Sequence, residues 1–150
     1  MLEENLEKLF VLFRANYYHR IIEKVGTGKG DLSAAESFCV EILYLLEQPT
    51  VTAFAQCLGI SVPNAAYKVS SLIEKGYLTR VPSKEDKREA YLAVTRKYLD
   101  DYGVKNRDNA QLIAQVREAF APEEVEELDR LLKKVVAIAG NPFKEKKIEK

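Results

Sequence analysis

The sequence predicts a mainly α-helical protein with a small β-hairpin wing: a winged helix-turn-helix head with further helices at both ends of the chain. Two observations predict this fold class. Between Thr52 and Gly76, two short stretches with apolar residues at helical spacing are joined by a few residues around Gly59. Directly afterwards, two alternating stretches flank a charged tip, which is the pattern of a hairpin.

Length and composition indicate one globular domain. The chain has 150 residues, a formal net charge of zero, two cysteines and one histidine. Such a chain buries a core of its own or completes it with a partner subunit. The sequence shows neither a secretion-signal pattern nor eighteen consecutive uncharged apolar residues, so we expect a cytoplasmic location.

The first two helices are expected before the head's turn. Apolar residues recur every three or four positions over residues 2–25, on a face wider than a small head covers, which predicts a dimerisation helix. Residues 26–30 are glycine-rich and are expected to be a flexible break. Ser33 and Glu36 form a capping box for a helix from 34 to about 47. The expected core stripe of that helix is Phe38, Ile42, Leu45 and Leu46.

The helix-turn-helix is expected to begin at Thr52 and to turn at Gly59. The second helix follows Ser61, whose hydroxyl suits an N-cap, and Pro63 falls in its first turn. Gly76 is expected to end it. Its expected buried stripe is Ala66, Val69, Leu72 and Ile73. In this geometry the second helix enters a major groove with its N-terminus first.

A wing is expected next, with strands at residues 77–82 and 90–95 around a tip at residues 83–89. The cations of the tip are Lys84, Lys87 and Arg88. They are placed to reach a phosphate backbone or a minor groove. After the wing, helices are expected from Arg96 to about Phe120 and from Pro122 to about Ala139.

These motifs resemble the multiple antibiotic resistance regulator (MarR) family of winged-helix transcription regulators. The wing reads Asp86-Lys-Arg88-Glu-Ala-Tyr-Leu92-Ala-Val94-Thr95, similar to the family's Asp-x-Arg followed by Leu or Val and then Leu-Thr. Leu58-Gly-Ile-Ser61 and Leu72-Ile-Glu-Lys-Gly76-Tyr-Leu78 resemble the family's turn and the end of its recognition helix. Family recognition helices often carry an Arg near their start, whereas Lys68 is the only cation in the first part of this one, residues 62–68.

The resemblance covers nearly the whole chain except its C-terminal tail. It implies a single domain with a head at about 33–95, dimerisation helices at about 2–25 and 96–139, and a frayed tail at 140–150. It also implies a homodimeric, non-enzymatic repressor that binds a pseudo-palindromic operator in double-stranded DNA and responds to a small aromatic or anionic effector.

The distribution of charge favours DNA as a partner although the net charge is zero. Residues 61–97 hold 8 Lys/Arg against 4 Asp/Glu, whereas residues 1–60 hold 5 against 8 and residues 98–150 hold 10 against 11. Phosphate contacts need local cations, and the excess lies in the expected head.

The candidate DNA-binding residues lie on the second head helix and on the wing. Small hydroxyl and amide side chains bond phosphates and base edges, and Lys68 more often indicates a phosphate contact. The resemblance implies that Asp86 holds Arg88 in place for the minor groove. The candidates are Ser61, Asn64, Tyr67, Lys68, Ser70, Ser71, Lys84, Lys87 and Arg88.

A polar-aromatic cluster is a candidate effector pocket, because family members often bind phenolic anions between the head and the dimer helices. It consists of Tyr17, Tyr18, His19, Arg20 and Tyr44. His19 or Arg20 would meet an anion, but the tyrosines equally suit a core or a dimer interface.

The sequence carries none of the nucleophile, carboxylate, glycine-loop or metal-ligand patterns of enzymes, so neither catalysis nor a cofactor is expected. Two alternatives stay open. One is a redox-responsive regulator through Cys57, although inert thiols are favoured and Cys39 suits a buried small hydrophobe. The other is a winged-helix module that binds proteins instead of DNA.

Overall fold

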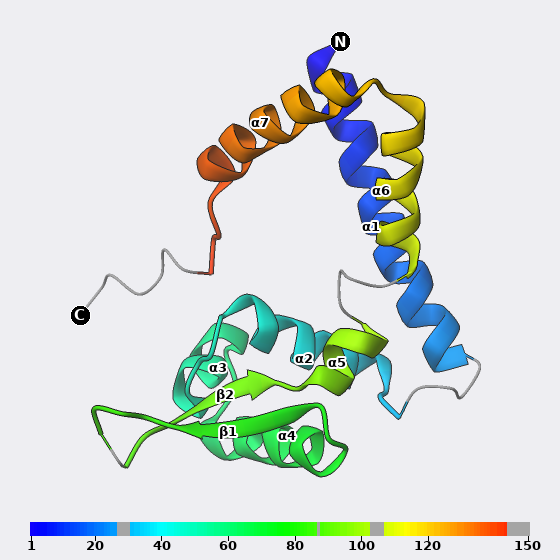
Figure 1. Ribbon diagram of the computed structural model, residues 1–150. Coiled ribbons are helices and arrows are strands. Elements are labelled where there is room, and N and C mark those ends of the chain that lie inside the picture. The colour runs from blue at the N-terminus through cyan, green and yellow to red at the C-terminus, as the bar shows by residue number, and fades with distance from the viewer. Residues whose placement is uncertain (27–30, 87, 103–106, 144–150) are drawn as a thin grey trace. The chain divides into compact units, whose positions relative to one another are not determined.

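The computed structural model describes residues 1–26, 31–86, 88–102 and 107–143, and no side chain is described for residues 107–109. Most of the expected break at 26–30, Lys87 and residues 144–150 of the tail lie outside the described residues. The described elements are α1 Leu2–Gly26, α2 Ala34–Leu45, α3 Val51–Leu58, α4 Val62–Glu74, β1 Leu78–Pro82, β2 Ala90–Val94, α5 Arg96–Asp101, α6 Arg107–Ala119 and α7 Pro122–Ala139 (Figure 1). This confirms the predicted fold class. No described helix combines the length and apolar character that a bilayer-spanning segment needs.

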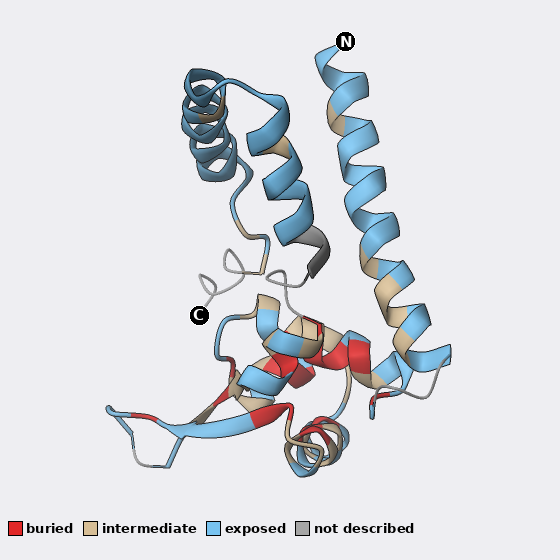
Figure 2. Ribbon diagram, turned by 45° about the vertical axis from the view of Figure 1, so that its right-hand side comes forward, coloured by how far each residue is buried: buried red, intermediate tan, exposed pale blue. Residues whose placement is uncertain are grey.

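The chain divides into two compact units, residues 1–95 and residues 96–150. The first unit contains the helix-turn-helix and the hairpin, and it holds most of the buried residues, whose ribbon is coloured red in Figure 2. In α1, by contrast, no residue is buried. The fully buried part of the protein is therefore concentrated in the head.

Local capping sets the ends of the head helices; Gly59, Ser61 and Pro63 act as predicted, whereas α3 begins at Val51, one residue before the predicted Thr52. The Thr50 hydroxyl caps α3 by accepting a hydrogen bond from the Ala53 N–H at 3.1 Å. Gly59 ends α3 in the left-handed region, at φ 64°. Ser61 caps α4 by accepting from the Asn64 N–H at 3.3 Å, with Pro63 in the first turn. The chain thus reverses between α3 and α4 within a few residues.

The buried face of α4 differs slightly from the predicted stripe. Ala65, Val69 and Leu72 are buried, whereas Ala66 and Ile73 are only half-buried. The prediction chose Ala66 as the first buried residue of α4, whereas Ala65 is buried instead. The sequence does not distinguish these two adjacent alanines.

The predicted core stripe of α2 was wrong. The buried residues of α2 are Ser37, Cys39, Val40 and Leu43. Phe38 leaves 55% of its side chain exposed, and the other predicted members, Ile42, Leu45 and Leu46, are half-buried. The helix is apolar on several sides, so its sequence alone does not determine which side faces the head's core.

The wing is an antiparallel hairpin with the predicted strands, in register from Leu78 opposite Val94 to Pro82 opposite Ala90. Backbone contacts attach it to the helices. The Leu92 N–H donates to the Pro49 carbonyl at 2.8 Å, and the Thr95 hydroxyl donates to the Gly76 carbonyl at 2.6 Å. These bonds fix the base of the wing while its tip projects away (Figure 1).

The second unit departs from the prediction of one long helix between Arg96 and Phe120. Helix α5 ends at Asp101, a turn follows at Tyr102, and α6 runs from Arg107 to Ala119. Gly103 follows that turn in the sequence, and glycine is a weak helix former. The last helix begins as expected: the Glu124 carboxylate accepts a hydrogen bond from the Ala121 N–H at 2.9 Å.

A network around Glu36 joins the start of α2 to the end of α4. Its carboxylate accepts from Lys75 Nζ at 2.8 Å, from Ser71 Oγ at 3.0 Å and from the Ser33 N–H at 2.9 Å. Lys75 Nζ also donates to the Asp31 carbonyl at 2.9 Å. Burial raises the pKa of Glu36, but the hydrogen bonds from Lys75, Ser33 and Ser71 outweigh it and lower the pKa from 4.5 to about 2.

We predict that this network stabilises the head above about pH 4.5 and that the stabilisation is lost as the pH falls towards about 2, because the folded pKa of Glu36 lies below its unfolded value. Glu36→Gln is expected to lower the free energy of unfolding by about 1–2 kcal/mol at pH 7 and to flatten its pH dependence below pH 4.5. Urea denaturation at a series of pH values measures both. Glu74→Gln changes an exposed carboxylate on α4 and is the control, which should show the same pH dependence of stability as the parent. If the free energy of unfolding of Glu36→Gln varies with pH in parallel with that of the parent, the prediction is contradicted.

Candidate nucleic-acid interface

The exposed face of α4 lies opposite its buried stripe. Residues at helical spacing on this face are Pro63, Tyr67, Ser70 and Glu74, and all are exposed. Tyr67 is the most open, with 77% of its side chain exposed. Asn64, in the first turn, is exposed beside them. The structure therefore brings three predicted contact residues, Asn64, Tyr67 and Ser70, to one surface of α4.

Two other candidates on α4 are directed towards α2. Ser71 is half-buried, and its hydroxyl donates to Glu36, so it helps to hold α4 in place. Lys68 is also half-buried. Burial raises the pKa of Cys39 on α2, and the positive charge of Lys68 lowers that pKa in part, so Lys68 lies near α2. Lys68 thus lies on the flank of α4, a position that suits a phosphate better than a base edge.

Short polar side chains organise the tip of the wing. The buried Ser83 hydroxyl accepts from the N–H groups of Glu85 and Asp86, each at 3.2 Å. Asp86 Oδ1 accepts from the Arg88 N–H at 2.8 Å, so Asp86 is bonded to the backbone of Arg88. Ser83 was not among the predicted site residues, although serine at the start of a turn is a recognised signal for this arrangement.

The cations of the head differ in how they are held. Lys75 is paired with Glu36 at 2.8 Å, and Arg96 is paired with Asp100 at 2.8 Å. Lys84 and Arg88 on the tip and Arg80 on β1 are exposed. The sequence analysis did not select Arg80, whose alternating position in a strand gave no signal beyond its charge. Lys87 lies outside the described residues.

The candidate effector residues fall into two places. In α1, Tyr17 is half-buried, Tyr18 is exposed, and their rings meet edge to face with centroids 5.4 Å apart. Burial and the nearby Glu41 raise the pKa of Tyr17. His19 is exposed and Arg20 is half-buried in the same helix.

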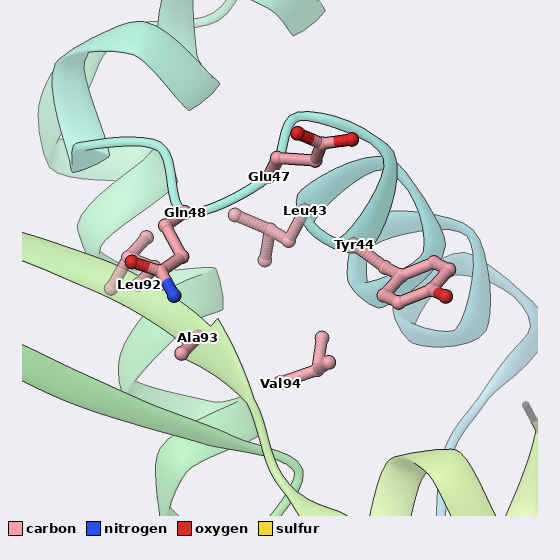
Figure 3. A pocket seen from close by; sticks show the side chains of 7 residues that line it. All are labelled: Leu43, Tyr44, Glu47, Gln48, Leu92, Ala93 and Val94. Carbon is pink, nitrogen blue, oxygen red and sulfur yellow. The ribbon is translucent and has the colours of Figure 1, made fainter. Parts of the chain in front are cut away.

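Tyr44 instead lines a cavity of about 430 Å³ between the end of α2 and β2 (Figure 3). Its lining consists of Leu43, Tyr44, Glu47, Gln48, Leu92, Ala93 and Val94. Glu47 and Gln48 adopt left-handed backbone conformations, at φ 52° and 62°, which are uncommon for residues other than glycine. The cavity lining combines the apolar Leu43, Leu92, Ala93 and Val94 with the polar Glu47 and Gln48.

The two cysteines are free thiols in different surroundings. Cys39 is buried in α2, where burial raises its pKa and keeps it protonated, and Cys57 is exposed at the end of α3. In the described part of the chain, no group of three or more His, Cys, Asp or Glu side chains is arranged to hold a metal ion.

Comparison with known proteins confirms the resemblance over the head. Residues 31–89 match the model of the MarR family. This segment runs from the start of α2 to the end of the wing's tip. A search among curated proteins gives no match.

Solved structures share the fold at low sequence identity. FabT of Streptococcus pneumoniae, in complex with DNA, is 18% identical with a TM-score of 0.52, over 90% of this chain and 94% of its own. Transcriptional regulator Tm0710 of Thermotoga maritima is 18% identical with a TM-score of 0.54, over 90% and 94%. The multiple antibiotic-resistance repressor of Listeria monocytogenes is 21% identical with a TM-score of 0.53, over 92% and 95%.

We predict that Arg88→Ala weakens binding to every duplex and lowers the slope of log affinity against log salt by about one unit per contact, or about two per dimer. Asp86→Ala should cost less, because it loosens the Arg88 backbone without removing the guanidinium. Titrations of a selected duplex and a scrambled duplex at several salt concentrations measure both effects. Arg117→Ala removes an exposed arginine of α6 and is the matched control. An unchanged slope for Arg88→Ala would show that the wing does not touch DNA.

Proposed function

We propose, from a head that belongs to the MarR family over residues 31–89, that this protein is a transcription regulator that binds double-stranded DNA. The carrying observation is the single exposed surface of α4 with Asn64, Tyr67 and Ser70, followed by a wing whose tip exposes Lys84 and Arg88. Helix α4 enters the major groove, and Arg88 reaches the adjacent minor groove, where a narrow groove strengthens the attraction. The DNA complex of FabT, which shares this fold, supports the assignment.

The regulator works as a homodimer on a pseudo-palindromic operator and represses transcription there. Helices α1 and α7 support the dimer, because each has an apolar face that the described chain leaves exposed. On α1 this face includes Leu2, Leu9, Phe10 and Phe13, and on α7 it includes Leu128, Leu131, Leu132 and Val135. Soluble monomers rarely expose contiguous apolar surface of this extent. Two heads spaced by about 34 Å then fit half-sites one helical turn apart.

A small molecule regulates binding from the cavity beside β2. Its lining joins the end of α2 to the strand that carries the wing, so an occupant that moves Leu92 or Val94 relative to Leu43 also moves the wing. Such an effector changes DNA affinity only by the difference between its affinities for the two arrangements. The apolar lining and the Tyr44 ring favour a small aromatic compound.

Two other functions compete with this proposal. The exposed Cys57 thiol favours a redox-responsive regulator, since it lies in α3 of the helix-turn-helix. A protein-binding module is favoured by the single lysine of α4, which limits the attraction of that helix to phosphates.

Selection of bound fragments from a random DNA pool tests the proposal. We expect enrichment of a two-fold-symmetric sequence whose retention falls steeply with salt. Absence of DNA retention at low salt favours the protein-binding module. Peroxide treatment of the parent and of Cys57→Ala forms a second arm: release of DNA from the parent alone favours the redox function, whereas equal retention favours the effector-controlled regulator.

We predict that Phe10→Glu shifts the protein from dimer to monomer, because it places a charge on the exposed apolar face of α1, where Phe10 is 61% exposed. Sedimentation equilibrium over a range of concentrations measures the shift. Tyr67→Glu makes the same kind of change at an exposed aromatic residue of α4 and should leave the dimer intact. A Phe10→Glu variant that dimerises as tightly as the parent would contradict the assignment of α1 to the interface.

A further inference from the structure

The first two turns of α4 expose apolar and amide side chains on more than one side of the helix. Val62 is 46% exposed and Tyr67 is 77% exposed, and Pro63 is exposed between them. Asn64 is exposed in the same turn, and its backbone N–H is already bonded to the Ser61 hydroxyl. The part of the helix that enters a groove first therefore offers two aliphatic side chains, an aromatic ring and a carboxamide.

This surface lacks the usual means of recognising guanine. Guanine is most often read by Arg or Lys, which donate to its O6 and N7 atoms. Helix α4 contains no arginine, and its single lysine, Lys68, is half-buried on the flank towards α2. Glu74 adds a negative charge at the far end of the exposed face. The exposed face of α4 therefore has no Arg or Lys side chain to donate to guanine.

The same surface matches the two features that A·T pairs show in the major groove. A carboxamide pairs with adenine through N6 and N7, and apolar side chains contact the C5-methyl group of thymine. We infer, on the basis of the proposed DNA-binding function, that α4 reads A·T pairs, with Asn64 on adenine and the exposed side chains of Val62 and Tyr67 against thymine methyl groups. Specificity then comes from methyl groups and one amide, while the wing supplies the charge.

Removal of single methyl groups from the operator tests this inference. Each thymine of a selected half-site is replaced in turn by uracil, which lacks only the C5-methyl group. Burial of one methyl group corresponds to about a threefold to fivefold change in affinity. We expect the parent to lose this factor at one or more thymines, and Val62→Ala or Tyr67→Ala to abolish the loss at its own position. Val81→Ala, an exposed valine of β1, is the matched control and should keep the parent's ratios throughout.

A second substitution in the DNA tests Asn64. Replacement of the contacted adenine by 7-deazaadenine removes the N7 acceptor and should weaken the parent about tenfold while leaving Asn64→Ala unaffected. The inference is overturned if the selected half-site is recognised through its G·C pairs, or if the parent binds with unchanged affinity after every thymine-to-uracil replacement. Either result leaves the proposed DNA-binding function intact. A protein that selects no sequence from the pool overturns the proposed function itself.

Discussion

The ion pair between Glu36 and Lys75 anchors the end of α4 to the start of α2. Lys75 follows the last turn of α4, and Glu36 belongs to the first turn of α2, so one contact joins two elements that are 39 residues apart in sequence. Charge-assisted hydrogen bonds are strong and directional, and this carboxylate receives them from three residues. Together with the buried Ala65, Val69 and Leu72, this contact sets which face of α4 stays exposed.

The consequences of this arrangement extend to the interface. With Ser71 drawn to Glu36 and Lys68 on the same side, the face that remains open is uncharged except for Glu74. In the proposed complex, affinity for phosphate rests on the wing, where Ser83 and Asp86 hydrogen-bond to backbone N–H groups of the tip. In the proposed DNA complex, α4 supplies the recognition of bases and the wing supplies the electrostatic attraction.

Features with a local cause could be predicted from the sequence. Ser61 and Gly59 act on backbone groups within a few residues, so their roles as helix cap and helix stop were readable from neighbouring positions. The hairpin register follows equally from the alternation on both sides of the tip. The prediction for Ser71 and the stripe of α2 depended instead on distant partners. The residues next to Ser71 do not reveal that its hydroxyl bonds to Glu36. The residues of α2 likewise do not reveal that Val40 is buried in the core while Phe38 is exposed.

The outer edge of the hairpin has a consequence for solubility. In the described two-stranded sheet β1 pairs with β2, so its other edge faces away from the ladder. An unprotected edge invites strands of other molecules to add to it. Pro82 has no N–H to offer there, and Arg80 brings a charge that a stacked copy would repeat at close range. The same short strand that carries the wing outward is thus poorly suited to seeding fibrils.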